Sequence, residues 1–466
     1  MLQSAMSGRF HRLGESDLSA LRFESVRAPA QVGGLGIIEA APLVDASGHL
    51  RIDHVRARIE SRLPLVPQLR RKLMFPGFGR GRALWVDDAR FNIANHVVES
   101  TVPPPGGEAE LLQACADTWP ELLDRSRPLW ELRFFSGMSG NRLGVTFKLH
   151  HALADGTAIV AMMQALFDFE AEAADPEVGQ WTPEPAPEAK SLVADNLSTR
   201  LHGMVKGIRR LPHIRGVISG FATFVSDIRM TLRFGSEAPK TSFNRKVSGR
   251  RMVRYLKTDL EDVRKVAHAS GGKVNDVVLD LVTAGLRDLL VGRREPVDGV
   301  QLKASVPVSL RRSADAKDLG NESGALVIPL PVFEADARRC LELIVAGTAK
   351  AKAEQRPAYG QAFMSWLSRL PIAQQFIDRQ RFINVLVTNV MGPPVPMYLL
   401  GARIQEVVPV IQLAGNLTLT FCAFSYAESL YIVATADAVA CPDVDTVKDG
   451  MERAWRSLRG PAAVTV

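Results

Sequence analysis

With 466 residues, the chain is long enough for two large domains or about three of average size. Its 46% apolar and 23% charged residues are typical of a globular protein, and no repeat at a solenoid period is present. The net charge of +7, from 57 basic and 50 acidic residues, is modest. Because no helix-turn-helix or RNA-binding signature occurs either, we expect no nucleic-acid partner.

Cysteine spacing and apolar stretches bear on the cellular compartment. The four cysteines have no paired spacing, which is typical of reduced thiols in a cytosolic protein; they are Cys115, Cys340, Cys422 and Cys441. Residues 1–10 lack the apolar run of a signal peptide. Two uncharged stretches, residues 382–402 and 407–427, reach the length of a membrane span, but prolines interrupt the first and polar residues alternate with apolar ones in the second. We therefore predict strands there, no transmembrane helix, and a cytoplasmic protein.

Residues 1–173 alternate strand and helix patterns and contain the most informative motif of the chain. Before it, the glycine-rich run 77–81 superficially suggests a phosphate loop, but no strand pattern precedes it and no Lys-Ser/Thr follows. Residues 144–150 alternate between two faces as a strand does, and apolar residues recur at helical spacing over 159–166. The motif His150-His151-Ala-Leu-Ala-Asp155-Gly156 therefore lies on a predicted strand-to-helix turn.

This motif combines the groups that a proton transfer needs. A neutral imidazole, with an unperturbed pKa of about 6.5, is the commonest proton acceptor near neutrality, and the turn presents one ring to a cleft while the other faces the scaffold. Asp155 is placed to hold the turn or the imidazole, and Gly156 keeps side-chain bulk away from a substrate. The alternatives are a surface pair or half of a metal site. Since no Cys or carboxylate lies at ligand spacing from His150 and His151, we expect no metal.

A linker and a basic segment separate the two halves. Residues 174–190 are acidic and proline-rich, which indicates a crossover or an exposed linker. From Arg200 to Arg233 there are seven basic residues and one acid, Asp227, and apolar residues recur helically on both sides of Pro212. This pattern predicts two basic amphipathic helices. Their apolar faces either pack on the body of the protein or dock onto anionic lipid, where each basic residue adds about 1 kcal/mol.

The second half resumes near Phe243 with alternating strands and helices. Asn275 and Asp276 stand at the start of a helical pattern, where such side chains usually cap the helix. Residues 389–393 look like a strand that ends in a turn, with either turn chemistry or a tunnel wall as their role.

Seven blocks in collinear order, beginning with Trp85, resemble the bacterial wax ester synthase / acyl-CoA:diacylglycerol acyltransferase family, within the chloramphenicol-acetyltransferase-like superfamily. Besides the double-histidine motif they are Trp85-Val-Asp-Asp88 with Asn95-His96-Val97, Pro128-Leu-Trp130, Asn275-Asp276, Val306-Pro-Val-Ser-Leu-Arg311, Gly320-Asn321 and Thr388-Asn-Val-Met-Gly-Pro393. Departures from the family pattern at Asn92, in 388–393 and in Ser425-Tyr-Ala-Glu428 bear on tunnel shape and acceptor choice.

The resemblance implies an α/β fold of two chloramphenicol-acetyltransferase-like lobes with a tunnel between them. We accordingly expect an N-terminal lobe at 1–173, a linker with basic helices at 174–242 and a C-terminal lobe at 243–466. Pro128 and Trp130 are expected to be structural anchors under the strand that leads to the motif.

The resemblance also implies an acyl-CoA-dependent O-acyltransferase that moves a long-chain acyl group to diacylglycerol and to fatty alcohols. In this interpretation His151 is the general base, His150 has a secondary role and Asp155 orients the loop through an ion pair, for which Arg311 is a candidate partner. Asn275 and Asp276 are expected to face the tunnel, where a donor holds the oxyanion.

Acyl-CoA is a co-substrate in this reaction, and no other cofactor is expected. No acyl-enzyme is needed, and the chain has no Gly-x-Ser-x-Gly elbow that would favour a serine esterase. The alternative is a catalytically weak lipid-binding or storage protein of the same fold. Either function predicts peripheral contact with the inner face of a membrane or with lipid inclusions.

Overall fold

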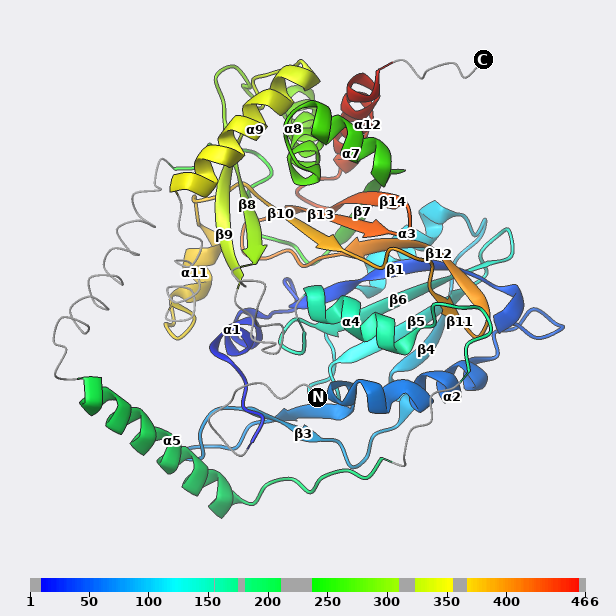
Figure 1. The fold of residues 1–466 in the computed structure, drawn as a ribbon, viewed down its shortest axis with the longest axis vertical. Coiled ribbons are helices and arrows are strands. Elements are labelled where there is room, and N and C mark those ends of the chain that lie inside the picture. The colour runs from blue at the N-terminus through cyan, green and yellow to red at the C-terminus, as the bar shows by residue number, and fades with distance from the viewer. Residues whose placement is uncertain are drawn as a thin grey trace.

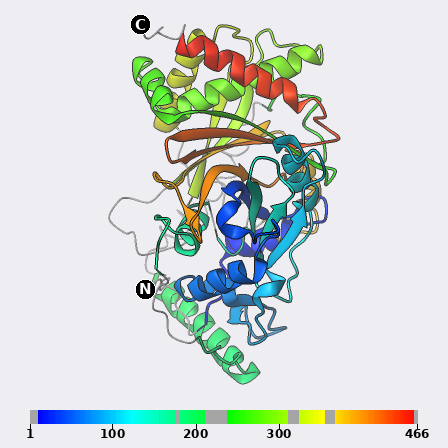
Figure 2. The ribbon, with the colours of Figure 1, turned by 90° about the vertical axis from the view of Figure 1, so that its right-hand side faces the viewer.

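The computed structural model describes residues 10–154, 156–174, 181–210, 237–309, 323–354 and 367–460. Two six-stranded sheets lie one above the other, with helices on both sides of the pair (Figure 1). A turn of the view by 90° shows the same layered order along the long axis (Figure 2). The predicted α/β fold is confirmed.

The first sheet has the strand order β11-β12-β1-β6-β5-β4. Its strands are β1 (Gln31–Glu39), β4 (Val97–Thr101), β5 (Trp130–Ser136), β6 (Arg142–His150), β11 (Tyr398–Leu399) and β12 (Ala402–Val410). Only β4 and β5 pair in parallel; the other neighbours are antiparallel. The central strand β6 is buried at every position after the first, because both of its faces are covered. The strand predicted over 144–150 is thus confirmed.

The second sheet has the order β7-β14-β13-β10-β8-β9. Its strands are β7 (Arg251–Asp259), β8 (Leu302–Ser309), β9 (Ser323–Leu330), β10 (Val385–Met391), β13 (Leu419–Tyr426) and β14 (Ser429–Asp437). The three strands β8, β10 and β13 run parallel to one another. With β12, strands β10 and β13 account for the two long uncharged stretches, so their prediction as sheet strands is confirmed.

The longer helices surround the two sheets. They are α1 (Glu15–Phe23), α2 (Ile52–Arg62), α3 (Glu108–Thr118), α4 (Gly156–Leu166), α5 (Ala189–Arg210), α7 (Leu260–Ala269), α8 (Val274–Gly292), α9 (Ala337–Glu354), α11 (Ala373–Asp378) and α12 (Val444–Arg459). A layer of α7, α8, α9 and α12 covers the side of the second sheet that faces away from the first (Figure 1). The helices predicted after Gly156 and from Asn275 are confirmed as α4 and α8.

The two halves of the chain exchange secondary structure. Strands β11 and β12 come from the second half, yet β12 pairs with β1 and so completes the first sheet. In return, Phe424 and Tyr426 of β13 lie in the hydrophobic core of the first sheet. The lobe boundaries at 173 and 243 stay a prediction, with residues 398–410 attached to the other sheet.

The first basic helix predicted near Arg200 is part of α5, which begins earlier, at Ala189, and is traced to Arg210. The second, predicted after Pro212, lies outside the described residues. All four cysteines lie in described residues, where each is buried and none is in a disulfide.

Candidate active site

The end of β6 is held by the segment that enters β1. The backbone N–H of His151 donates to the carbonyl of Ala30 at 2.8 Å, one residue before Gln31 pairs with His150. Strand β1 approaches β6 closely because Gly33 has a φ of 153°, and a Cβ at that position would lie 1.8 Å from the carbonyl oxygen of Phe147. Only glycine fits there. The location of His151 therefore depends on residues far earlier in the chain.

His150 points into the protein and is only 1% exposed. The backbone N–H of Ala152 donates to its Nδ1 at 2.9 Å, so the neutral ring carries its proton on Nε2. That Nε2 lies 3.3 Å from Oε1 of Glu24. His150 thus contacts the turn from inside the protein, and its predicted secondary role stays a prediction.

Glu24, at the end of α1, was not singled out by the sequence analysis. Its carboxylate contacts Arg125 Nη2 at 2.7 Å and accepts the backbone N–H of Ala30 at 3.3 Å, besides facing His150. Burial acts to raise the pKa of Glu24, but hydrogen bonds from His150 and Arg125 outweigh it and leave the pKa below its ordinary value. An ionised Glu24 therefore ties together His150 and the Ala30 segment that holds His151.

His151 follows β6 directly and is half-buried, while its neighbour is enclosed. The prediction that one ring of the pair faces the scaffold is confirmed for His150, and the cleft predicted for the other ring stays a prediction. Asp155 and Arg311 lie outside the described residues, so their ion pair stays a prediction. Gly156 opens α4, and a Cβ there would lie 3.3 Å from Cγ2 of Val390 in β10. The second sheet therefore contacts the motif at Gly156.

An apolar cavity of about 430 Å³ adjoins this turn. Its lining includes Phe23 of α1, Ala28 and Ala30 before β1, and Phe376 and Ile377 of α11. The polar side chains in this lining are all neutral glutamines. The volume is within the roughly 300–1,000 Å³ of ligand pockets. Because the carbonyl of Ala30 holds the backbone of His151, the cavity wall and the candidate base are neighbours.

Asn275 and Asp276 lie at the start of α8, in the helical layer beyond the second sheet (Figure 1). The carboxylate of Asp276 is buried and accepts the backbone N–H of Lys273 at 2.8 Å, which closes the helix N-terminus. The helix packs against α7, α9 and α12. The structure therefore assigns Asp276 a capping role in a different layer from His151, and the oxyanion role of this pair stays a prediction.

Other sequence blocks build the framework. Trp130 is buried, and its Nε1 donates to the carbonyl of Leu69 at 2.7 Å. The His96 ring stacks on Trp130 with centroids 4.6 Å apart. Tyr426 of the second sheet donates its hydroxyl to the carbonyl of Ile404 in the first sheet at 2.8 Å. Pro128 lies just before β5, and its carbonyl accepts the N–H of Trp130. The predicted structural role of Trp130 is confirmed.

Within the described ranges, no three His, Cys, Asp or Glu side chains gather as a metal site. None of the helices in these ranges has both the length and the apolar character that crossing a bilayer requires.

Comparisons with known proteins agree with the geometry. A family model for the wax ester synthase/diacylglycerol acyltransferase catalytic domain matches residues 13–278, and one for the C-terminal domain of the same family matches residues 319–459. The "Probable diacyglycerol O-acyltransferase tgs1" of Mycobacterium tuberculosis (strain H37Rv) is 27% identical over 444 residues, covering 92% of this chain and 90% of the relative.

Solved structures share the fold. A wax ester synthase/diacylglycerol acyltransferase from Marinobacter aquaeolei VT8 aligns with a TM-score of 0.68 at 22% identity, over 96% of this chain and 98% of that one. The trichothecene 15-O-acetyltransferase TRI3 of Fusarium sporotrichioides aligns with a TM-score of 0.61 at 13% identity, over 98% and 97% of the two chains. The chain thus belongs to the wax ester synthase/diacylglycerol acyltransferase family and is an acyltransferase of that type.

Proposed function

We propose that the protein transfers a long-chain acyl group from acyl-CoA to the free hydroxyl of diacylglycerol, with His151 as general base. The observation that carries this proposal is the junction at Ala30, a residue that lines the apolar cavity and whose carbonyl accepts the backbone N–H of His151. In this proposal, a lipid chain in the cavity reaches the imidazole past Ala30, the lining residue that the backbone of His151 contacts.

In the proposed reaction, His151 takes the proton of the acceptor hydroxyl while that oxygen attacks the thioester carbonyl. The resulting tetrahedral oxyanion collapses, the carbon–sulfur bond breaks, and the imidazolium returns its proton to the CoA thiolate. An ester and free CoA result, and the histidine is regenerated. Positioned proton transfer of this kind typically contributes 10²–10⁴-fold to the rate. No covalent acyl-enzyme and no cofactor other than the co-substrate acyl-CoA are involved.

The supporting residues act through His151. Glu24 and His150 hold its strand end, as their contacts show. Asp155 keeps its proposed role of orienting the loop, and Gly156 that of leaving room beside Val390. We retain Asn275 and Asp276 as proposed residues of the oxyanion site, and Asp276 also caps α8 through its contact with Lys273.

A long-chain fatty alcohol is the second acceptor that the cavity supports. Among the described residues, its lining consists of apolar side chains and neutral glutamines, which suit the alkyl chain of either acceptor. We therefore propose wax ester synthesis as a second activity. Both acceptors reside in lipid, so we place the enzyme at the inner face of the membrane or on lipid inclusions.

Purified protein with palmitoyl-CoA and either dioleoylglycerol or hexadecanol tests the proposal. Release of CoA thiol is followed optically, and the lipid products are identified by mass spectrometry. We expect triacylglycerol from the first acceptor and hexadecyl palmitate from the second. If the wild type and His151→Ala both released thiol at the blank rate with either acceptor, the chain would instead be a lipid-binding protein of this fold.

A further inference from the structure

The loop between β2 (Arg71–Met74) and β3 (Leu84–Asp87) presents an aromatic side chain to solvent. Phe78 at its tip is fully exposed, and Phe75 is 60% exposed. Gly77 and Gly79 on either side of Phe78 have φ values of 83° and 79°, which favour glycine, and no atom lies within 4 Å of a Cβ at either position. A strand does precede this glycine-rich run, contrary to the sequence analysis, but a strand rather than a helix follows it. The loop is therefore a tight turn that holds an apolar ring in water.

Helix α5 lies beside this loop. The amide of Asn196 donates to the carbonyl of Gly79 at 2.8 Å, and Asp195 pairs with Arg12 at 2.7 Å. Leu192 is buried against Leu84 and Val86. These contacts occupy one face of the helix and anchor it to the β2–β3 hairpin.

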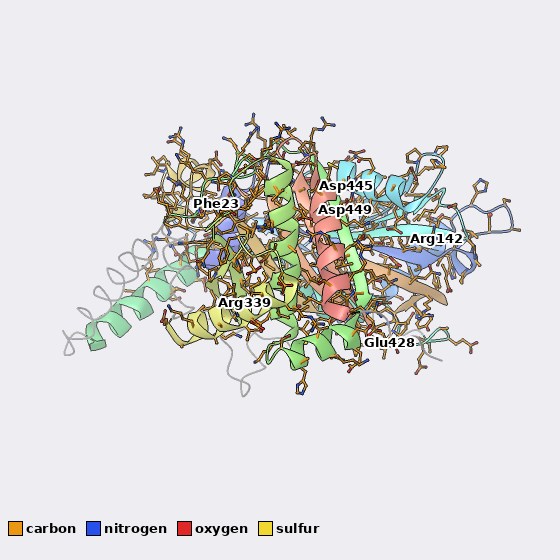
Figure 3. All side chains as sticks on the ribbon, turned by 90° about the horizontal axis from the view of Figure 1, so that it is seen from above. Phe23, Arg142, Arg339, Glu428, Asp445 and Asp449 are labelled. Carbon is orange, nitrogen blue, oxygen red and sulfur yellow. The ribbon has the colours of Figure 1, made fainter. Side chains whose placement is uncertain are left out.

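A second face of α5 carries apolar side chains that the body does not cover. Val193, Leu197 and Leu201 follow one another at intervals of four residues and are 46%, 57% and 50% exposed. The helix stands off to one side of the molecule in views that differ by 90° (Figures 1 and 3). Packing on the body therefore accounts for only part of the apolar surface of this helix, and exposed apolar patches of this kind mark interaction sites.

The surroundings of these side chains are basic. Among the described side chains of α5, Lys190 and Arg200 are basic, whereas the acidic Asp195 is already paired with Arg12. The loop adds Arg80 and Arg82, both exposed, and has no acid. Two acids, Glu184 and Glu188, precede the helix at its other end. An apolar strip flanked by positively charged side chains is complementary to an anionic lipid surface.

The same side of the molecule carries the apolar cavity. Arg82 contacts Glu15 at the start of α1 at 3.3 Å, and Ala20 and Phe23 of the same helix line the cavity. Phe23 lies on the side of the molecule from which α5 extends (Figure 3). A lipid surface in contact with the loop and α5 would thus meet the protein next to the cavity.

We propose that Phe75, Phe78, Val193, Leu197 and Leu201, with the basic residues around them, form a docking surface for an anionic phospholipid bilayer. This inference rests on the proposed function, because it supplies the route by which a bilayer-borne acceptor reaches the cavity. Phe78 inserts between the headgroups, α5 lies along the bilayer surface, and the arginines contact the lipid phosphates.

Flotation with lipid vesicles tests the docking surface on the full-length protein. The wild type, Phe78→Ser, Leu197→Ser and the double variant are mixed with vesicles of phosphatidylcholine alone or with phosphatidylglycerol. Val439→Ser is the matched control, since Val439 is 60% exposed but lies outside the docking surface. We expect the wild type and the control to float with anionic vesicles, and each single variant to bind roughly tenfold or more weakly. Binding of the wild type should fall at high salt.

Turnover with dispersed dioctanoylglycerol separates docking from catalysis. The docking variants should keep wild-type turnover with this acceptor and lose it with vesicle-borne dioleoylglycerol. Inactivity of the wild type with both acceptors would instead count against the proposed function. The docking proposal is wrong if the serine variants float like the wild type, or if the wild type does not bind anionic vesicles. It is also wrong if Phe78→Ser abolishes a dimer in sedimentation velocity without changing vesicle binding.

Discussion

Removing the carboxylate of Glu24 tests how the structure holds its candidate base. In Glu24→Ala, the buried Nε2 of His150 and the N–H of Ala30 lose the group they face, while Arg125 is partly exposed and can turn to water. A buried polar group left without its partner costs about 1–3 kcal/mol. We therefore expect a loss of about 2–4 kcal/mol in the free energy of unfolding, and a reduction of kcat by about 10–100-fold as the Ala30 segment loosens. The KM for acyl-CoA should change less.

Glu24→Gln and a surface control refine this test. The glutamine keeps the shape but not the charge, so its effects should fall between those of the wild type and Glu24→Ala. Glu261→Gln, which breaks an exposed pair with Arg264, should change neither stability nor kcat measurably. Urea unfolding and steady-state kinetics on the same preparations provide both readouts.

The stabilisation that Glu24 provides should depend on pH. The folded-state pKa of Glu24 is lowered, so its stabilisation is fully present above the ordinary pKa of 4.5 and is lost as the pH falls through the folded value. The difference in unfolding free energy between the wild type and Glu24→Gln should therefore shrink in acid. Wild-type stability and kcat in Glu24→Ala at pH 7 would refute the positioning role.

Two further predictions concern Gly156 and Asp280. Gly156→Val should lower the free energy of unfolding by about 1–3 kcal/mol and reduce kcat, because even a Cβ would lie 3.3 Å from Cγ2 of Val390. Unchanged urea unfolding and turnover in this variant would contradict the close contact. Burial raises the pKa of Asp280 to about 7, although a hydrogen bond with Cys340 partly opposes it. Its protonated form is therefore favoured by folding, and stability should fall as the pH rises from about 4 to about 7. Asp280→Asn should remove this decline and gain up to about 4 kcal/mol at pH 8 but little at pH 4.5 in urea unfolding. Equal pH profiles of the wild type and the variant would show that the pKa of Asp280 is not raised on folding.

Much of the local structure was predictable because it follows from residue spacing. The period-2 pattern before His150 and the helical pattern after Gly156 predicted β6 and α4, and together they placed the motif on the turn between them. The alternation of polar and apolar residues within 407–427 likewise predicted strands there rather than a membrane span. These signals are local, so a single sequence carries them.

Tertiary relations were harder to predict. Glu24, just after α1, contacts His150 at the end of β6, and no residue spacing in the sequence predicts that contact. The pairing of β12 with β1 depends on sheet topology, which local pattern does not determine. The exposed stripe of α5 was equally compatible with burial, since an amphipathic pattern does not say what covers it.

The most direct test of the central claim is the turnover of His151→Ala with palmitoyl-CoA and dioleoylglycerol, compared with the wild type at pH 7.5. Because the substitution keeps the backbone N–H that donates to Ala30, the variant should unfold at nearly the wild-type urea concentration. We predict that its kcat is lower by 10²–10⁴-fold, the range typical of a lost general base. A folded His151→Ala that forms triacylglycerol within tenfold of the wild-type rate would contradict the assignment of His151 as the base.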